Sequence, residues 1–291
     1  MLIFLNGEFV PEERAVVSVF DRGFLYGDGL FESILVRNGK PFRWAQHLER
    51  LQRGAEFLKI KLPFSPDELR DFAGQLIAKN SMSDGLLRIT LSRGVGLRGY
   101  SPKGAEKSTL VMTMHPVSGR ADMPVGHDAQ QRVATPKWKL ITSSFRLPAN
   151  EPLAQFKTAN KLAQVLARAE ADDAGADEAL LLNTNGFIVE GASCNLFWVQ
   201  RGAVCTPPLA SGILAGVTRA IVLELCLKLS LSVQEIAVTP DELRRTEGVF
   251  LTLSTLGVVV AVALDGKPLT QSPIVGKLRS AFVELMEVET G

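Results

Sequence analysis

Two lysines in the stretch QFKTANKLAQVLARAEA, Lys157 and Lys161, are the candidates for a catalytic amine. Lys161 falls at the edge of the apolar face of a predicted helix, a position typical of a solvated side chain. Lys157 stands where LAQF turns into this helix, and a lysine at such a junction can point into a cleft. Desolvation there lowers the pKa of the amine, as a Schiff-base lysine requires, although an ordinary surface lysine also fits the spacing. The helical periodicity predicts a core-facing stripe formed by Leu162, Val165, Leu166 and Ala169.

A lysine that forms a Schiff base with a pyridine cofactor also needs an acid at the ring nitrogen and a cradle for a phosphate. In NGFIVEGASCNLFW a strand ends at Glu190, and the small residues after it would let a flat ring approach the backbone. In SGILAGVTR two glycines precede a helix that begins with Val217 and Thr218, where free N–H groups and the helix dipole favour phosphate. Ser254 and Thr255 in FLTLSTLG could add hydroxyl donors or merely end a strand. Taken singly, an acid facing water and a Gly-rich loop before a capped helix explain these patterns equally well.

The stretch SRGVGLRGYSP contains a literal GxGxxG at Gly94, Gly96 and Gly99. A dinucleotide site would need a helix directly afterwards and an acid about 20 residues further on. The following YSPKG cannot start that helix smoothly, so we reject this interpretation. The same stretch fits a substrate loop better, because the guanidinium of Arg98 is a planar fork that matches a carboxylate, with a solvated loop arginine as the alternative.

The surrounding segments predict the elements that position these residues. MLIFLNGEFV and FESILVRNGKPF each place short apolar runs about an Asn-Gly pair, the strongest short-range signal for a hairpin. Two helices are predicted over residues 43–60 and 65–81, the second opened by a capping box of Ser65 and Glu68. Further strands are predicted over 86–92, 109–117, 133–140, 178–183, 186–190, 195–199, 202–206, 248–254 and 258–264, and further helices over 157–174, 217–230 and 274–288.

This order of elements predicts an α+β chain of two domains. Residues 1–117 form a small αβ domain, and residues 133–291 form a larger, strand-rich domain with helices outside. The segment between them, residues 118–132, is polar and broken by Gly and Pro, which is typical of a linker.

The totals favour an enzyme that acts on small molecules. Of the 291 residues, 46% are hydrophobic and 22% charged, with 32 basic against 31 acidic side chains. Such neutrality predicts no nucleic-acid or membrane partner. The three cysteines lack the spacing of a disulfide framework or a metal site, and we expect reduced thiols and no metal. With no signal peptide and no apolar run of about 18 residues, a cytoplasmic location is expected.

Taken in order, these motifs resemble the class IV aminotransferase family, fold-type IV enzymes of pyridoxal 5′-phosphate. The resemblance rests on KTANKLAQVLARAEADDAGADEALLLNTNGFIVEGASCNLFWV and SGILAGVTR, preceded by DRGFLYGDGLFES and HLERL, and covers nearly the whole chain. It implies a homodimer with pyridoxal 5′-phosphate held between two domains, the larger of them barrel-like. Lys157 would be the Schiff-base lysine, Glu190 the acid at the pyridine nitrogen and Arg50 the arginine at the phosphate. The phosphate cup would be completed by Val217, Thr218 and either Ser254 or Thr255.

Within this family the wording is most similar to aminodeoxychorismate lyases, which release 4-aminobenzoate and pyruvate. D-amino-acid aminotransferases, which also place an arginine at Arg98, come next, and branched-chain aminotransferases third, because no GGNY-type run follows Lys157. A non-catalytic binder of the cofactor is the remaining alternative. The substrate-binding residues expected in any of the enzymes are Arg98, Tyr100, Phe31 and Ser33.

Overall fold

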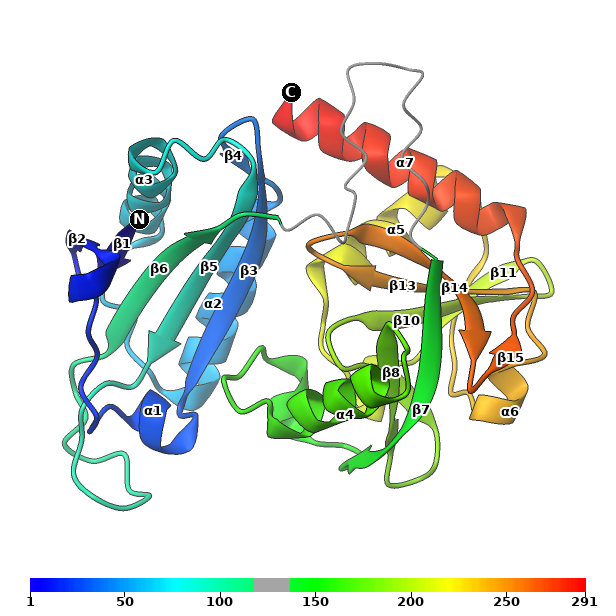
Figure 1. Ribbon diagram of the computed structural model, residues 1–291, viewed down its shortest axis with the longest axis horizontal. Helices are drawn as coiled ribbons and strands as arrows, with labels where there is room; N and C mark the ends of the chain where they lie inside the picture. Colours follow the sequence, from blue (N-terminus) through cyan, green and yellow to red (C-terminus); the bar gives the residue numbers. More distant parts are fainter. Residues whose placement is uncertain (118–136) are drawn as a thin grey trace. The chain divides into compact units, whose positions relative to one another are not determined.

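The computed structural model describes residues 1–117 and 137–291, which form two compact units (Figure 1). The first unit comprises residues 1–117, the short stretch Phe156–Asn160 and the last residues Glu289–Gly291. The described part of the second unit comprises residues 137–155 and 161–288. The predicted linker over 118–132 and the first residues of the strand predicted over 133–140 lie outside the described residues. Lys157 therefore belongs to the first unit, although it follows the first strand of the second.

The first unit is a six-stranded sheet in the order β2-β1-β6-β5-β3-β4, with α2 and α3 against one face (Figure 1). Both predicted Asn-Gly hairpins are confirmed, because Leu5 pairs with Glu8 and Arg37 with Lys40 across the turns. The capping box of Ser65 and Glu68 is also present. The elements are β1 (Leu2–Leu5), β2 (Glu8–Pro11), η1 (Glu12–Arg14), α1 (Arg22–Tyr26), β3 (Gly29–Arg37), β4 (Lys40–Pro41), α2 (Trp44–Leu58), α3 (Pro66–Lys79), β5 (Gly85–Ser92) and β6 (Thr109–His115).

The two faces of this sheet differ in burial. Because strand side chains alternate, Leu30, Glu32 and Ile34 of β3 point toward the helices, where they are at most 1% exposed. Phe31 and Ser33, on the opposite face of the strand, are only half-buried. The strand thus presents the predicted substrate-binding pair on the face that the helices of this unit do not cover.

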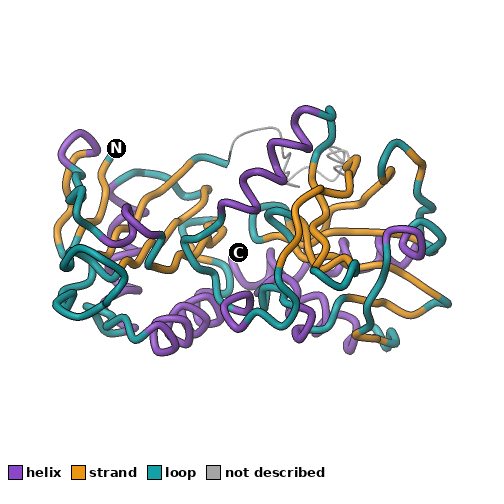
Figure 2. Tube along the Cα trace, turned by 90° about the horizontal axis from the view of Figure 1, so that it is seen from below, coloured by secondary structure: helices purple, strands orange, loops and turns teal. Residues whose placement is uncertain are grey.

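The second unit contains a closed sheet and the remaining helices. Strands β10, β13, β14, β7, β8 and β9 pair in this order, and β9 pairs back to β10, which closes a six-stranded barrel. Both units carry helices and strands (Figure 2), as the α+β prediction requires. The elements are β7 (Lys137–Leu147), η2 (Pro152–Gln155), α4 (Leu162–Asp173), β8 (Glu178–Asn183), β9 (Ile188–Gly191), β10 (Asn195–Gln200), β11 (Ala203–Thr206), η3 (Leu209–Ser211), α5 (Val217–Lys228), β12 (Val233–Glu235), α6 (Pro240–Leu243), β13 (Gly248–Leu253), β14 (Gly257–Leu264), β15 (Lys267–Pro268) and α7 (Pro273–Thr290).

Helix α4 corrects one prediction from the sequence. It begins at Leu162 with Lys161 as its N-cap residue, so Lys157 lies outside the helix. The apolar stripe is exposed rather than buried, with Leu162 66%, Val165 60% and Leu166 39% exposed, and Ala169 exposed as well. The helix packs on β7 and β8 through Ala167 and Ala171 instead. Small side chains let the helix approach the sheet closely, and periodicity alone cannot tell which side of a helix a sheet will cover.

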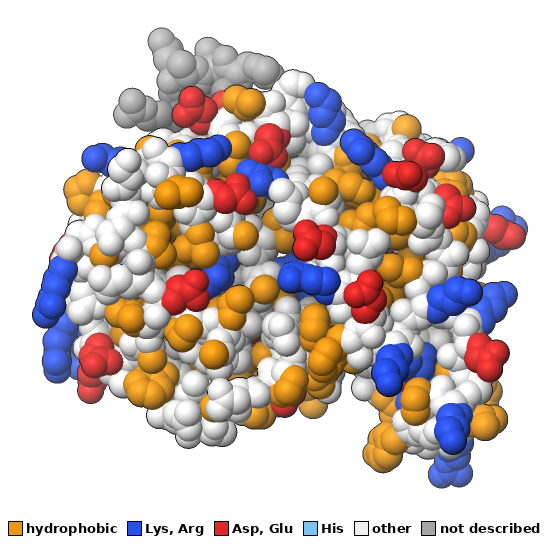
Figure 3. All heavy atoms as spheres, turned by 180° about the vertical axis from the view of Figure 1, so that it is seen from behind, with side chains coloured by type: hydrophobic (Ala, Val, Ile, Leu, Met, Phe, Trp, Pro, Cys, Tyr) orange, Lys and Arg blue, Asp and Glu red, His pale blue; other side chains and the backbone are white. Residues whose placement is uncertain are grey.

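The described residues place charges of both signs at the surface and the three cysteines in the interior. Acidic, basic and apolar side chains all occur on the face drawn in Figure 3. The three cysteines are free and buried. Among the described residues, no helix is long and apolar enough to span a bilayer, and no three His, Cys, Asp or Glu side chains are grouped to hold a metal ion.

Candidate active site

Lys157 lies in an extended segment that pairs with the start of β3. The Phe31 N–H donates to the carbonyl of Lys157 (2.9 Å) and the Ala159 N–H to the carbonyl of Gly29 (2.8 Å). Phe156, next to Lys157, is 9% exposed and packs in the core of the first unit. The segment is therefore anchored on both sides of Lys157, which fixes its backbone more firmly than a helix end that can fray.

The aromatic ring of Phe31 is flanked by two cations. The Nζ of Lys157 lies 4.6 Å and the guanidinium carbon of Arg88 lies 4.0 Å from the ring centroid, both within the range of cation–π attraction. Arg88 is half-buried on β5, directly opposite Ser33, and its burial lowers the pKa of the guanidinium. Lys157, Phe31 and Ser33, predicted separately from the sequence, are thus gathered on one face of the sheet beside an arginine that the sequence did not single out.

A buried cluster of charges occupies the opposite face of β3. Glu32 is 1% exposed, and its two oxygens accept hydrogen bonds from Nε (2.7 Å) and Nη2 (2.6 Å) of Arg50. His47 Nδ1 lies 2.7 Å from the same carboxylate. The planar fork of Arg50 is therefore held in one orientation by a bidentate partner, which is the strongest geometry available to an arginine.

The electrostatics of this cluster keep Glu32 ionised. Burial alone would raise the pKa of Glu32, but the charges and hydrogen bonds of Arg50 and His47 outweigh it and lower that pKa to about 2. Burial lowers the pKa of His47, and the charges of Arg50 and Lys157 act in the same direction against Glu32. Near neutral pH the cluster thus combines an anionic Glu32, a cationic Arg50 and a neutral His47.

In the second unit, Glu190 lies near the end of β9 and is 8% exposed. Its Oε2 accepts a hydrogen bond from the backbone N–H of Leu214 (2.9 Å). Asn195, which pairs with Glu190 across the sheet, donates from Nδ2 to the carbonyl of Leu214 (2.9 Å). Glu190 and Asn195 thus bind the backbone N–H and the carbonyl of Leu214, which lies in the loop before α5. The two hydrogen bonds tie this loop to the end of β9 and the start of β10.

The start of α5 has features that let a ligand approach its backbone closely. A Cβ at Gly216, the N-cap residue, would lie 2.0 Å from Oδ1 of Asn195, so a side chain there would displace the Asn195 amide that bonds Leu214. Gly216 supplies no side-chain cap, and the first residues of the helix, Val217 and Thr218, are buried. Across from Asn195, Thr252 on β13 has a buried Oγ1 without a hydrogen-bond partner among the described residues. An uncapped helix start and a buried hydroxyl without a partner fit an anionic ligand with several acceptor oxygens.

The remaining predicted residues lie in loops. Ser254 and Thr255 are half-buried in the turn between β13 and β14, and β13 packs against α5. Arg98 and Tyr100 lie in the β5–β6 loop of the first unit, where Tyr100 is 88% exposed and Arg98 is also exposed. The side chain of Arg98 makes no hydrogen bond or ion pair within the part of the chain that the structure describes.

The sequence reasoning missed three participants, namely Glu32, His47 and Arg88. Glu32 is a carboxylate within an otherwise apolar strand, and His47 shares a helix face with Arg50 at i, i+3 spacing, so both carried a readable signal. Arg88 interrupts the apolar strand LLRITLS in the same way. A charged residue inside a strand indicates a partner on the facing element, but the partner's identity requires the register.

Comparison with known proteins identifies the family. The family described as amino-transferase class IV matches residues 29–264, from the start of β3 to the end of β14. The chain therefore belongs to the class IV aminotransferases and is an enzyme of this family.

Its relatives differ in their reactions. A Methanocaldococcus jannaschii protein, provisionally named a branched-chain-amino-acid aminotransferase, is 34% identical over 98% of this chain and 96% of its own length. The D-alanine aminotransferase of Staphylococcus aureus is 29% identical over 98% of both chains. The aminodeoxychorismate lyase of Bacillus subtilis is 28% identical over 89% of this chain and 85% of its own. Family membership thus leaves a choice between amino transfer and elimination.

A solved relative bears on the fold and the cofactor. A branched-chain amino acid aminotransferase from T.th., solved with pyridoxamine 5′-phosphate, superimposes with a TM-score of 0.87 at 30% identity, over 98% of this chain and 93% of that one. The fold is fold-type IV and the cofactor is pyridoxal 5′-phosphate, as the motifs predicted. The residues of each unit fit parts of this group, since the first unit provides an extended lysine beside an aromatic ring and the second provides a buried strand-end carboxylate and an uncapped helix start.

Proposed function

We propose that this enzyme is an aminodeoxychorismate lyase, which converts 4-amino-4-deoxychorismate to 4-aminobenzoate and pyruvate. The observation that carries the proposal is the pair of arginines that the first unit offers to a substrate with two carboxylates. Arg88 is half-buried over the Phe31 ring beside Lys157, and Arg98 is exposed on the β5–β6 loop. Neither side chain has an ion-pair partner among the described residues, so both suit a bidentate contact with an incoming carboxylate.

We assign the following roles in cofactor binding. Lys157 holds the cofactor covalently through Nζ, Glu190 keeps a proton on the ring nitrogen, and Arg50 meets the phosphate. Val217 and Thr218 at the start of α5, with Ser254 or Thr255, complete the phosphate cup. The bidentate contact of Glu32 with Nε and Nη2 supports the role of Arg50, because it fixes the plane of the guanidinium before a ligand arrives. Bound pyridoxal 5′-phosphate supplies an electron sink for negative charge at the carbon that bears the amine.

The chain's own residues then perform the proton transfers. Once the substrate amine has displaced Lys157 from its covalent linkage, the freed Nζ would remove the proton from the ring carbon that carries the amine. The electron pair left behind forms a ring double bond while the C–O bond to the enolpyruvyl group breaks. The departing enol takes up a proton and becomes pyruvate, and the aromatic ring of 4-aminobenzoate remains. Neither water nor an amino acceptor is consumed, so the reaction needs one substrate only.

An aminotransferase is the second candidate, and the names of the relatives favour it. Two of the relatives described above, at 34% and 29% identity, are named as branched-chain and D-alanine aminotransferases. In that reaction Lys157 would remove the same kind of proton and return it to the cofactor, and a 2-oxo acid would accept the amine. Arg88 would then receive the side-chain carboxylate of a dicarboxylic amino acid.

The deciding experiment measures pyruvate release from 4-amino-4-deoxychorismate by the cofactor-loaded protein with no 2-oxo acid present. We expect many pyruvates per enzyme, with 4-aminobenzoate in equal amount. Absence of pyruvate, combined with amino transfer from D-alanine or a branched-chain amino acid to a 2-oxo acid, would reject the lyase in favour of the aminotransferase.

We also propose that the enzyme works as a homodimer. The apolar stripe of α4 supports this, because Leu162, Val165 and Leu166 are too exposed for an isolated surface helix. Sedimentation equilibrium should give a dimer for the wild type and a monomer for Leu162→Glu/Val165→Glu. A stable wild-type monomer that retains full turnover would contradict the proposal.

A further inference from the structure

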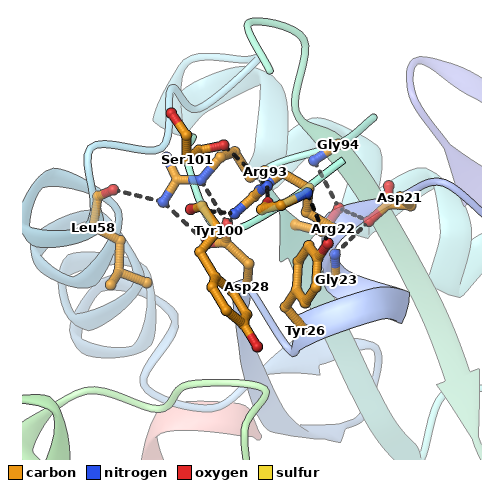
Figure 4. A network of polar contacts seen from close by, with 12 residues as sticks. Asp21, Arg22, Gly23, Tyr26, Asp28, Leu58, Arg93, Gly94, Tyr100 and Ser101 are labelled. Carbon is orange, nitrogen blue, oxygen red and sulfur yellow. Dashed lines mark hydrogen bonds and ion pairs between the residues drawn. The ribbon is translucent and has the colours of Figure 1, made fainter. Parts of the chain in front are cut away.

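Arg22, the first residue of α1, is 4% exposed and reaches into the loop that carries Arg98 and Tyr100 (Figure 4). Its Nη1 donates to the carbonyls of Gly99 (2.8 Å) and Ser101 (3.2 Å), and its Nη2 to the carbonyl of Tyr100 (3.1 Å). The Arg22 side chain therefore binds three consecutive carbonyls of the loop, those of residues 99 to 101. The exposed Tyr100 is the middle residue of the three.

Asp28 holds Arg22 in place from behind. Its Oδ2 accepts from Nε of Arg22 (2.8 Å) and from Nε of Arg93 (2.8 Å), and its Oδ1 accepts from Nη2 of Arg93 (3.0 Å). Arg93 also donates to the carbonyls of Leu58 (2.9 Å) and Lys59 (3.1 Å) at the end of α2. Burial would raise the pKa of Asp28, but hydrogen bonds and charges of Arg93 and Arg22 outweigh it and lower that pKa. The loop is thus tied through Arg22 and Asp28 to a helix of the core.

The loop backbone is shaped to accept this arginine. Gly94 has a φ of +85° and a side chain there would collide with the carbonyl of Lys107. A Cβ at Gly96 would lie 3.0 Å from Cδ of Arg22, so the loop runs directly over the arginine stem. Tyr26, one turn along α1, accepts a hydrogen bond from the Gly99 N–H at its hydroxyl (3.2 Å) and lies with its ring 5.5 Å from that of Tyr100.

We propose that Arg22 is a positioning residue for substrate binding, which aims the Arg98 and Tyr100 side chains by fixing the carbonyls of residues 99 to 101. This inference rests on the proposed function in taking Arg98 and Tyr100 as substrate contacts. An exposed loop would otherwise sample many orientations, and fixing it before the substrate arrives removes that entropy from the binding step. Lysine cannot replace the arginine, since a single ammonium cannot bond Asp28 and three carbonyls at once.

The test uses Arg22→Lys in the cofactor-loaded protein, with Arg37→Lys as the matched control. Arg37 is a buried arginine of the same unit, paired with Asp84 (3.0 Å) and remote from the loop in its contacts. We expect Arg22→Lys to raise KM for the amino substrate about 10-fold, with kcat within about twofold, because charge-assisted hydrogen bonds that orient the binding group are lost. Arg37→Lys should change neither constant.

A double-mutant cycle separates positioning from general stability. In an Arg98→Ala background, Arg22→Lys should raise KM far less than in the wild type, because the group it aims is already gone. An equal rise in both backgrounds would overturn the proposal. If Arg22→Lys does not fold, Tyr26→Phe removes only the hydroxyl that bonds Gly99 and should act in the same direction with a smaller effect.

A readout independent of turnover keeps the two proposals distinguishable. Trypsin can cut after Arg98 and Lys103 only if the loop opens, so native-state cleavage there should be at least several-fold faster in Arg22→Lys than in Arg37→Lys. Unchanged cleavage would reject the positioning role even if the enzyme is active. Faster cleavage in a protein that turns over neither aminodeoxychorismate nor any amino acid would instead reject the proposed function alone.

Discussion

The charged side chains on the two faces of strand β3 have different roles. On the inner face Glu32 meets Arg50 and His47 in a cluster that is at most 4% exposed and balances its own charge. On the outer face the Phe31 ring lies between the cations of Lys157 and Arg88 on a half-buried surface. Neighbouring residues of one strand thus separate the ion pair that orients Arg50 from the cations beside Phe31 that suit substrate binding and proton transfer. The period-two alternation of a strand makes this separation possible without any additional element.

The largest expected effect comes from the outer face. Lys157→Ala removes the group that moves the proton, and turnover should fall at least about 10²- to 10⁴-fold, with loss of the covalent cofactor linkage. Turnover assays and the visible absorbance of the bound cofactor measure this. Lys161→Ala, which changes the N-cap residue of α4, is the control and should remain active. The reverse pattern would show that the wrong lysine has been assigned.

On the inner face the expected effect is on stability. Glu32→Gln keeps the volume but leaves the buried charge of Arg50 without its bidentate partner, which should cost about 3–5 kcal/mol of unfolding free energy. Denaturant unfolding of the cofactor-free protein measures the loss. Asp84→Asn breaks the more exposed pair with Arg37 and should cost about 1 kcal/mol or less. Equal losses of unfolding free energy in Glu32→Gln and Asp84→Asn would contradict the larger contribution assigned to the buried Glu32 pair.

The pH dependence of stability sharpens the same contrast. Because the pKa of Glu32 falls from 4.5 to about 2 on folding, its contribution is complete above pH 4.5 and is lost as the pH falls toward 2. At about 1.4 kcal/mol per pKa unit this amounts to about 3 kcal/mol. Unfolding curves between these pH values should show the loss in the wild type and a flatter profile in Glu32→Gln. A profile identical in both proteins would refute the assignment.

The smallest effect is expected at Arg88. Arg88→Gln should raise KM for aminodeoxychorismate about 10-fold, since one bidentate contact to a carboxylate is lost. Arg88→Lys keeps the positive charge but lacks the planar guanidinium, so its KM should lie between those of the wild type and Arg88→Gln. The single-carboxylate substrate D-alanine, if it is turned over at all, provides the internal control and should be unaffected. An equal rise in KM for D-alanine would mean that Arg88 binds the single carboxylate of D-alanine, and not only a second carboxylate that aminodeoxychorismate carries.

Much of the fold was readable from local patterns. The Asn-Gly turns specify their hairpins because Asn6, Gly7, Asn38 and Gly39 all adopt positive φ, which few other residues tolerate. The Ser65–Glu68 capping box specifies the start of α3 in the same local way. Motif order also identified the family and its cofactor, because the wording of the segments around Lys157 and Glu190 is specific.

The course of the chain around Lys157 was not readable in this way. The helical pattern of residues 157–174 is real, yet the helix begins only at Leu162 because residues 157–159 pair with β3 instead. A strand partner far away in the sequence competes with the local helical preference and wins where its hydrogen bonds are available.

By itself, therefore, the sequence determined the turns, the caps, the order of the elements, the family and the cofactor, since each depends on residues close together or on a specific wording. Only the tertiary structure decided which face of α4 is buried, that Glu32 is the partner of Arg50, and that Arg88 lies beside Lys157. These depend on strand register and on which surfaces meet. Periodicity states which residues share a face, whereas the partner of that face is chosen by contacts between distant segments.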